Sequence, residues 1–400
     1  MILIISSDHI PHIGGKSTHI MSLMDGIKRN GEEAYLFTQS QYPRIILTTI
    51  KLLLSPVMFY DRNLFQHLYN KIWRGILCKR TLKLYNKLHP SCISCQDACA
   101  AASLKKIRSK VDCPIILTMH TYFGIENGLD NKFDDLKKRL YTYNLNYELE
   151  SLEVADKIIA VDDRIKKHVQ DTIASLSKKV QVRTRSCVSI ENFTNVDIFT
   201  PGTEADKEKA REKLGIKANA FVIICARRLV EKNGVIYAVE AMKKASDEAI
   251  LLIAGDGPQR EAIEKRISEL GLEAKVRLLG SVSSAEIVGL YKAADCSLVP
   301  SVTVNGLQEA TSISALEAMS CGLPTIASRI GGLIQIISDG ENGYLIDERD
   351  PVQISEAIDR LRDETVRREM SRNARNYVVD NHSHVVGARD YLNQFKETLS

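Results

Sequence analysis

Short apolar segments alternate with helical sequence along this chain, and the alternation starts again after a polar run at 201–213. Strands alternating with helices form parallel sheets that are covered on both faces. With 400 residues the chain also exceeds the usual size of one hydrophobic core. The pattern predicts two α/β halves, joined by the polar run, with a cleft between them. The candidate strands are 1–5, 33–38, 91–95, 115–118 and 157–161 in the first half, and 221–226, 250–254, 276–279, 296–299 and 324–327 in the second.

The composition is that of an ordinary globular protein, but the charge is unevenly distributed. Nine Lys or Arg and one acid lie between Arg44 and Lys87, a local balance of +8 in a chain with a net charge of +4. Aliphatic residues interleave with these cations. Such a segment lies on an anionic membrane surface or, as we favour, forms a helical insert that packs its apolar side inward. A nucleic-acid partner is not expected, because stacking aromatics are few there.

Nine cysteines and no recognisable secretory signal indicate reduced thiols in a cytoplasm. Cys92, Cys95 and Cys99 have a spacing that suggests a metal site, but the sequence offers no second cluster or His pair to complete it. We therefore predict no metal and no cofactor. No apolar run is long enough to span a membrane, so contact with a membrane would be peripheral, at its inner face.

The segment 308–322 carries two carboxylates, Glu309 and Glu317, where loop sequence changes to helical sequence. If the helix begins near Ser312 or Ser314, both acids can approach one ligand that lies across the helix N-terminus. Backbone N–H groups there suit phosphates, and carboxylates suit hydroxyls. The alternative is structural: Ser314 and Glu317 match a capping box.

Other polar groups follow predicted strands, at the sheet edge where α/β proteins bind ligands. A glycine pair, Gly14 and Gly15, follows the first strand and precedes a helix, which is typical of phosphate-binding loops. After the strand 221–226 come cations that can neutralise a diphosphate. The polar groups are Gly14, Gly15, His120, Arg227, Arg228 and Lys232.

Six segments, taken together, resemble the retaining glycosyltransferases of family 4, which belong to the glycosyl transferases group 1 and have the GT-B fold. The segments are GGKSTH at 14–19, R-x4-K at 227–232, AGDGP at 254–258, LYKAADCSLVPS at 290–301, E-x7-E at 309–317 and AMSCGLPTIAS at 318–328. The resemblance implies two Rossmann-like domains whose parallel sheets face a central cleft. They would be an acceptor-binding domain at 1–200 and a nucleotide-sugar-binding domain at 201–380, with a helix at 381–400 crossing back to the first.

The resemblance also implies roles for the candidate residues. Glu309 would contact hydroxyls of the donor sugar, and Glu317 the ribose. Arg227 and Lys232 would hold the diphosphate, to which Gly15 would offer its N–H group. The set expected to be catalytic is His120, Arg227, Lys232 and Glu309, and the set expected to bind the donor is Gly14, Gly15, Arg228, Glu309, Ser312 and Glu317.

The implied activity is a metal-independent, retaining hexosyl transfer from a UDP- or GDP-sugar to an acceptor glycan, lipid or small molecule. Two alternatives stay open: a sugar-nucleotide epimerase of the same fold, and an inactive subunit that binds nucleotide sugar. The family usually has glycines after the first Glu, where this chain has Ala310, Thr311 and Ser312. The donor loop is therefore expected to differ in shape.

Overall fold

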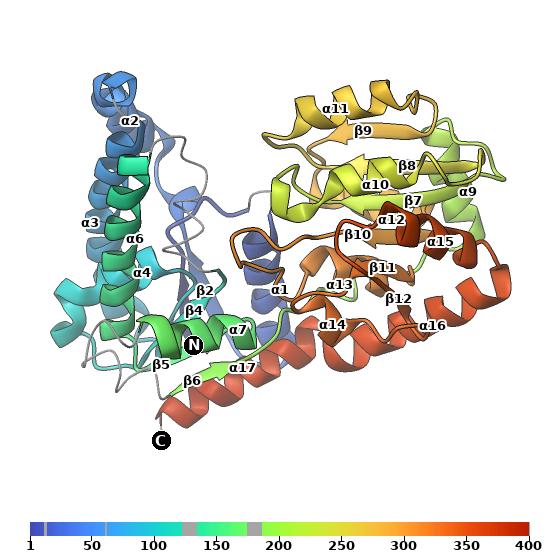
Figure 1. Ribbon diagram of the computed structural model, residues 1–400. Coiled ribbons are helices and arrows are strands. Elements are labelled where there is room, and N and C mark those ends of the chain that lie inside the picture. Colours follow the sequence, from blue (N-terminus) through green and yellow to red (C-terminus); the bar gives the residue numbers. More distant parts are fainter. Residues whose placement is uncertain (12–13, 61, 122–133, 174–185, 400) are drawn as a thin grey trace. The chain divides into compact units, whose positions relative to one another are not determined.

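The computed structural model describes residues 1–11, 14–60, 62–121, 134–173 and 186–399. Contacts between Cα atoms group the chain into two compact units. The first unit comprises 1–12, 23–191 and 387–400, and the second comprises 13–22 and 192–386. In the described part of the chain, each unit contains a parallel sheet of six strands, with helices on both faces (Figure 1). The predicted fold class, α/β with two parallel sheets, is confirmed.

In the first sheet the strand order reverses at β1, which lies between β2 and β3. The chain runs from β1 out to β2 at one edge, then returns to β3 on the other side of β1 and continues outward. β1 and β3 are buried along their whole length, whereas β2, at an edge, is partly exposed. In spatial order the strands are β2 (Ala34–Phe37), β1 (Ile2–Ile5), β3 (Cys92–Cys95), β4 (Ile115–Met119), β5 (Lys157–Ala160) and β6 (Cys187–Ser189).

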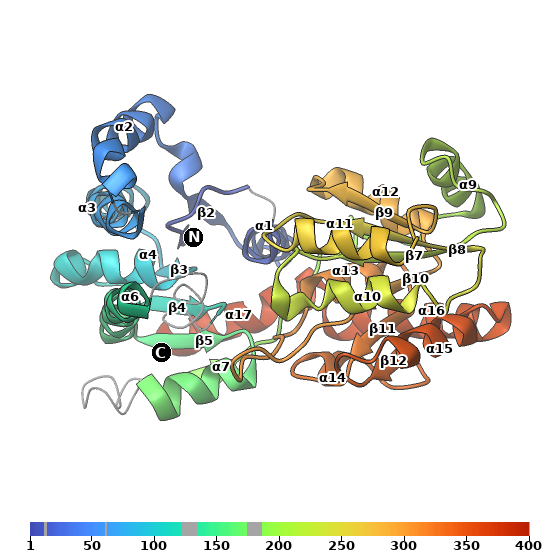
Figure 2. The same ribbon diagram turned by 45° about the horizontal axis from the view of Figure 1, so that its top comes forward.

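The helices of the first unit include a long pair formed by the basic segment. α2 (Arg44–Tyr60) and α3 (Arg62–Leu88) lie side by side, as both views show (Figure 2). α3 buries Tyr69, Trp73 and Leu77, as expected of an insert that packs inward, but α2 leaves several apolar side chains exposed. The other helices are α1 (Gly15–Arg29), which has residues in both units, α4 (Ala98–Ser103), α6 (Asp134–Val154) and α7 (Asp163–Lys167), with 3-10 turns at Gln39–Gln41 and Leu104–Lys110 and a π-helical turn at His168–Ile173.

The second sheet has its own reversal between β7 and β10. From β7 the chain adds β8 and β9 on one side, then β10, β11 and β12 on the other. The carboxyl ends of the two strands at such a reversal border a crevice in which α/β proteins bind ligands. In spatial order the strands are β12 (Gly343–Ile346), β11 (Thr325–Ser328), β10 (Cys296–Val299), β7 (Phe221–Ala226), β8 (Ala249–Ala254) and β9 (Val276–Gly280).

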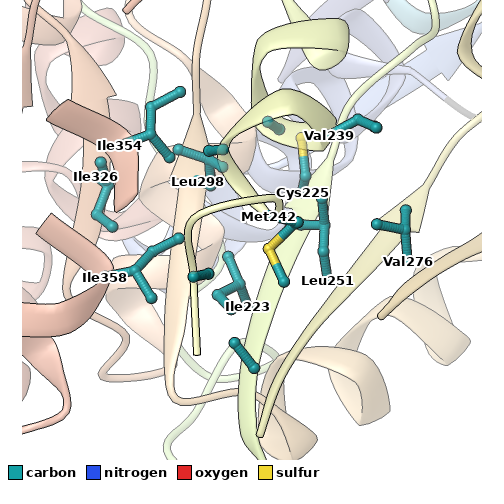
Figure 3. Packing of buried hydrophobic residues seen from close by; sticks show 14 of the residues in the cluster. Ile223, Cys225, Val239, Met242, Leu251, Val276, Leu298, Ile326, Ile354 and Ile358 are labelled. Atoms are coloured by element: carbon teal, nitrogen blue, oxygen red, sulfur yellow. The ribbon is translucent and has the colours of Figure 1, made fainter. Parts of the chain in front are cut away.

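Alternate side chains of β7 pack on opposite faces of this sheet. Ile223 and Cys225 join a cluster that includes side chains of α10, α11 and α15 (Figure 3). Val222 and Ile224 point the other way, into a cluster with side chains of α12 and α13. Burial on both faces explains why the strand reads as the continuous apolar run FVIICA. The helices are α10 (Val235–Ala241), α11 (Arg260–Glu269), α12 (Ser284–Ala293), α13 (Ile313–Ser320) and α15 (Pro351–Leu361).

The polar run at 201–213, which we predicted to be a linker, contains a helix of the second unit. Thr203 starts α9 (Glu204–Lys213) through a capping box, in which Thr203 Oγ1 accepts from Asp206 N and the Asp206 side chain accepts from Thr203 N. The remaining helices are α14 (Leu333–Ile336), α16 (Glu364–Asn381) and α17 (His384–Leu399). In the ranges that the structure describes, no helix has the length and apolarity that crossing a membrane requires.

All nine cysteines are free thiols. Cys92 and Cys95 are buried in β3, and Cys99 is buried in α4. Burial raises the pKa of Cys92 to about 12 and that of Cys95 well above its ordinary value. The thiols of Cys92 and Cys95 therefore stay protonated at neutral pH.

Candidate active site

Four polar segments meet at the carboxyl edge of the second sheet. One follows β7 and begins with Arg227, one is the glycine turn after β8, one follows β10 and includes Ser301, and the last is the 308–312 loop that leads into α13. Because β7 and β10 are the two strands at the reversal, these segments border the crevice that the topology creates.

Arg227 is the centre of this cluster. Its Nη1 donates to Glu309 Oε1 at 3.1 Å and its Nη2 to Glu309 Oε2 at 2.7 Å, which makes a bidentate ion pair. Nη1 also donates to Ser312 Oγ at 3.0 Å, and Nη2 donates to Ser301 Oγ at 3.0 Å and Asn233 Oδ1 at 2.5 Å. The guanidinium thus joins the ends of β7 and β10 to the loop before α13.

The surroundings of Arg227 keep it charged and fixed. Burial alone would lower the pKa of Arg227, but the charge and hydrogen bonds of Glu309 raise it. Its backbone is held by the AGDGP turn: a Cβ added to Gly255, where φ is +154°, would lie 1.9 Å from the Arg227 carbonyl oxygen. The buried Nε–H of Arg227 has no hydrogen-bond partner among the described residues. An unsatisfied buried donor in a native structure calls for an explanation, and a bound ligand would be one.

Arg228 and Lys232 continue from the same strand. Arg228 is exposed, so the structure resolves which of the two adjacent arginines turns inward: it is Arg227. Lys232 lies in a 3-10 turn, Glu231–Asn233, and its carbonyl accepts from Val302 N at 2.8 Å. The residue at the end of the R-x4-K motif is thereby placed beside the loop that follows β10.

The loop before Glu309 is shaped by a tight turn. Asn305 and Gly306 both have positive φ, at 51° and 76°, and Val304 and Leu307 exchange backbone hydrogen bonds across them. The side chain of Glu348 accepts from the backbone N–H and, at 2.9 Å, from the hydroxyl of Thr303. The loop is therefore anchored on the segment that follows β12.

Residues 310–312, where the family usually has glycine, adopt no positive φ in this structure. The left-handed residues of the loop lie earlier, in the turn just described. A close backbone contact is nevertheless made from the other side, because a Cβ on Gly332 would lie 2.5 Å from Thr311 N. The loop thus packs closely against the segment after β11, at Gly332.

Glu317 points into a buried environment on α13, and its carboxyl does not cap the helix. The helix begins at Ile313, with Ser312 at the N-cap position and no capping hydrogen bond from the Ser312 side chain. Burial raises the pKa of Glu317 to about 8, and the hydrogen bond from Tyr291, whose OH lies 3.2 Å from Glu317 Oε2, opposes this. The capping-box alternative is therefore not what the structure shows.

The N-terminal part of α1 groups with the second unit. A Cβ on Gly15 would lie 3.4 Å from Ile313 Cδ1, at the start of α13, and Gly14 precedes it with a φ of 150°. One turn later, His19 Nδ1 lies 3.1 Å from Asn192 Oδ1, and Asn192 Nδ2 donates to the Thr311 carbonyl at 2.8 Å. Asn192 therefore links α1, at His19, to the loop that leads from Glu309 into α13.

His120 lies in the first unit, directly after β4. Its Nε2 is 3.1 Å from Gln96 Oε1. Nearby in the chain, the buried carboxylate of Asp97 accepts from the hydroxyls of Ser6 and Ser7, at 2.8 and 2.7 Å. These groups follow β1, β3 and β4, so the carboxyl edge of the first sheet has a polar cluster of its own.

Several residues of the clusters were not found from the sequence. Asn and Ser are common in loops, so nothing distinguished the ones that bind Arg227, and Tyr291 reads as a core aromatic of α12. Their position after a predicted strand was the one available signal, and it applied to Ser301 and to the Gln96–Asp97 pair. The residues missed are Gln96, Asp97, Asn192, Asn233, Tyr291 and Ser301.

Comparison with known proteins agrees with this architecture. The glycosyl transferases group 1 family matches residues 206–377, and glycosyltransferase family 4 matches residues 13–182. An uncharacterized glycosyltransferase from Methanocaldococcus jannaschii is 28% identical over 99% of this chain and 97% of its own length. A D-inositol 3-phosphate glycosyltransferase from Corynebacterium diphtheriae is 28% identical over 64% of this chain, and the match spans 59% of that protein.

Solved structures share the fold over the full length. A glycosyltransferase from Rickettsia africae superposes with a TM-score of 0.71 at 17% identity, covering 100% of this chain and 98% of that one. Anabaena HepE in complex with UDP-glucose gives 0.69 at 17% identity, with 99% of both chains covered. The two parallel α/β units thus have the GT-B fold. The chain belongs to glycosyltransferase family 4, in the glycosyl transferases group 1.

Proposed function

We propose that this protein transfers a sugar from a nucleotide-diphosphate sugar to a hydroxyl group of an acceptor, with retention of the anomeric configuration and without a metal ion. The observation that carries the proposal is the meeting of Arg227, Glu309 and the N-terminus of α13 at the reversal of the second sheet. Structural neighbours in complex with UDP-glucose or with ADP support a nucleotide donor. A UDP- or GDP-sugar is the expected substrate.

The site residues divide between the two ends of such a donor. Glu309 would accept hydrogen bonds from sugar hydroxyls and Glu317 from the ribose, since carboxylates are strong acceptors. The diphosphate would lie between them, against Lys232, Arg228, the Nε–H of Arg227 and the N–H groups of the first turn of α13. Gly14 and Gly15 would approach it closely because they have no side chain, and Ser312 would hold Arg227 in place.

The chemistry follows from the charges that develop. As the bond from the anomeric carbon to the phosphate oxygen breaks, positive charge grows on the sugar and negative charge on the diphosphate. Fixed cations and a helix N-terminus stabilise that negative charge without reorganising. The acceptor oxygen forms the new bond on the same face, and its proton passes to the leaving diphosphate. No protein nucleophile is needed, and His120 would bind donor or acceptor near the reacting centre.

The acceptor would be held by the first unit. The names of relatives include inositol phosphate as an acceptor, so phosphorylated polyols belong in the first acceptor panel, beside glycans and lipid-linked sugars.

A two-stage experiment tests the proposal. Thermal-shift measurements with UDP, GDP, ADP, dTDP and their sugar conjugates should single out one nucleotide, which at 100 times its Kd adds about 2.7 kcal/mol of stability. That donor is then incubated with the acceptor panel, with and without EDTA, and the anomeric coupling constant of the product is read by NMR. Inverted product, or turnover abolished by EDTA, contradicts the proposed mechanism; a converted donor without any acceptor indicates an epimerase.

A further inference from the structure

Helix α2 has an outer apolar stripe that the described residues of the first unit leave exposed. Ile45, Leu52 and Phe59 are 75%, 71% and 86% exposed, whereas Leu47 is buried. The three exposed residues are seven apart, or about two turns, so they line up along the helix. Leu52 lies five positions after Leu47, which places the stripe about 140° away from the buried side. We call Ile45, Leu52 and Phe59 the outer stripe.

This degree of exposure is unusual for the chain. Among the described residues, the four most exposed large hydrophobic side chains all belong to α2, and the next, Ile198, is 55% exposed. Apolar side chains scattered singly on a surface need no explanation, but a contiguous set marks an interaction site. The α2 residues with exposed large apolar side chains are Ile45, Ile46, Leu52, Leu53, Met58 and Phe59.

The charged residues within α2 and α3 are all cations. Arg44 and Lys51 directly precede Ile45 and Leu52, so they flank the stripe, and Lys51 Nζ lies 5.4 Å from the ring centroid of Tyr69 on α3. Neither α2 nor α3 contains an acidic residue. The further cations with exposed side chains on α3 are Lys71, Lys79, Arg80, Lys83 and Lys87.

We propose that α2, together with the exposed cations of α2 and α3, is a docking surface for an anionic lipid bilayer. α2 would lie in the plane of the interface, with the outer stripe inserted among the acyl chains and the long cationic side chains reaching the headgroups. Its 17 residues extend about 25 Å, and Pro56 interrupts its hydrogen-bond ladder, so it is suited to lie on a membrane rather than to cross one.

A second copy of the chain fits this surface less well. In a two-fold contact the same patch meets itself, so the cations of α2 and α3 would face cations, and neither helix offers an acid to pair with them. Anionic lipids supply the missing negative charge. The inference does not depend on the proposed activity, and its test requires no donor or acceptor.

The test is flotation of the full chain with vesicles of phosphatidylcholine alone or mixed with phosphatidylglycerol. We expect binding to the anionic vesicles that weakens at high salt, and little binding to the neutral ones. Leu52→Ser and Phe59→Ser should each weaken binding about tenfold. Lys79→Gln and Arg80→Gln should each weaken it about fivefold.

Ile198→Ser is the matched control, because Ile198 is an exposed aliphatic residue of the second unit, and it should bind vesicles as the wild type does. The melting temperatures of all variants are compared with that of the wild type. If Leu52→Ser and Phe59→Ser both fail to fold, the vesicle binding of Ile45→Ser and of the charge variants tests the proposal instead. The proposal is overturned if the wild type ignores anionic vesicles or if Ile198→Ser loses as much binding as Leu52→Ser. It is equally overturned if light scattering shows a dimer that Leu52→Ser dissociates while vesicle binding persists.

Discussion

Arg227 and Glu309 face each other through two parallel hydrogen bonds, at 2.7 and 3.1 Å, although 82 residues separate them in the chain. Their side chains are only 8% and 14% exposed. The pair joins the end of β7 to the loop before α13, on the two sides of the reversal in the sheet. It therefore fixes the position of that loop relative to the end of β7.

Removing one partner of this pair should be costly. Arg227→Ala leaves the Glu309 carboxylate in a mostly buried place without its cation, which typically costs about 3–5 kcal/mol. For a unit of this size each kcal/mol lowers the melting temperature by about 2–4 °C. Scanning calorimetry of Arg227→Ala, Glu309→Ala and the double variant should show that the double variant loses less than the sum of the single variants.

Arg228→Ala is the control for this cycle, since the adjacent side chain is exposed and its removal should change stability by less than about 0.5 kcal/mol. Equal melting temperatures for Arg227→Ala and Arg228→Ala would show that the buried ion pair does not stabilise the unit.

The AGDGP turn gives a second prediction. In Gly255→Ala the new Cβ would start 1.9 Å from the Arg227 carbonyl oxygen, so the turn or Arg227 must move. Gly271→Ala is matched to it, because Gly271 also has a positive φ, of 65°, but no atom lies within 4 Å of its Cβ position. We expect Gly271→Ala to cost about 1 kcal/mol, from backbone strain alone, and Gly255→Ala to cost distinctly more. Thermal melts of the two variants compare them directly; similar losses would mean that the turn accommodates the methyl group.

Central strands were the most predictable part of the fold. β7 and β10 are buried on both faces, so the apolar run FVIICA and the mostly apolar CSLV marked them at 221–226 and 296–299, the limits that the structure shows. The edge strands β6 and β12 escaped notice because each has only three or four residues and is partly exposed. The prediction of a linker at 201–213 was wrong for another reason: α9 is a surface helix with few apolar residues, so no apolar face marks it in the sequence.

For the site, the sequence predicted the types of polar residue and the sheet edge at which they lie, but not which residues contact one another. Arg227, Lys232 and Ser312 were placed near the sheet edge because they follow strands or precede a helix. Which of two adjacent arginines turns inward depends on side-chain direction at the end of β7, and the bond from Arg227 to Glu309 depends on how a long loop folds. Neither has a local sequence signal.

His19 should make stability depend on pH below neutrality. Burial lowers its pKa from 6.5 to about 4, against the hydrogen bond with Asn192. Between these values the unfolded chain binds the proton and the folded one does not, so stability is lost as pH falls through the window. From pH 6.5 to 5 the contribution of His19 to stability should fall by about 2 kcal/mol. The difference in stability between the wild type and His19→Gln should change by this amount over the range, whereas the difference between the wild type and His9→Gln, at an exposed histidine, should stay constant. Parallel curves for His19→Gln and the wild type would refute the assignment.

Glu317 should impose the opposite slope. Its folded pKa of about 8 exceeds the ordinary 4.5, so the folded state holds a proton that the unfolded state has lost. Its contribution is complete below about pH 4.5 and declines as pH rises toward 8. Between about pH 5.5 and 7.5 this contribution should fall by about 1.4 kcal/mol per pH unit. The stability of the wild type minus that of Glu317→Gln should fall at this rate, and a constant difference would assign the slope to another group.

Donor binding should then release a proton from the same carboxyl group. Ribose hydroxyls that donate to Glu317 favour its ionised form, and at pH 7 a carboxyl with a pKa of about 8 is mostly protonated, so nearly one proton leaves as the nucleotide binds. Calorimetric titration with the selected nucleotide in phosphate and in Tris buffer measures this release, because the two buffers differ in ionisation enthalpy. In Glu317→Gln the release should fall to that of the nucleotide's own phosphate. If the wild type binds nucleotide with the same heat in both buffers, Glu317 does not accept hydrogen bonds from the ribose hydroxyls, and its proposed place in the donor site is wrong. The proposed roles of Arg227 and Glu309 do not depend on this result.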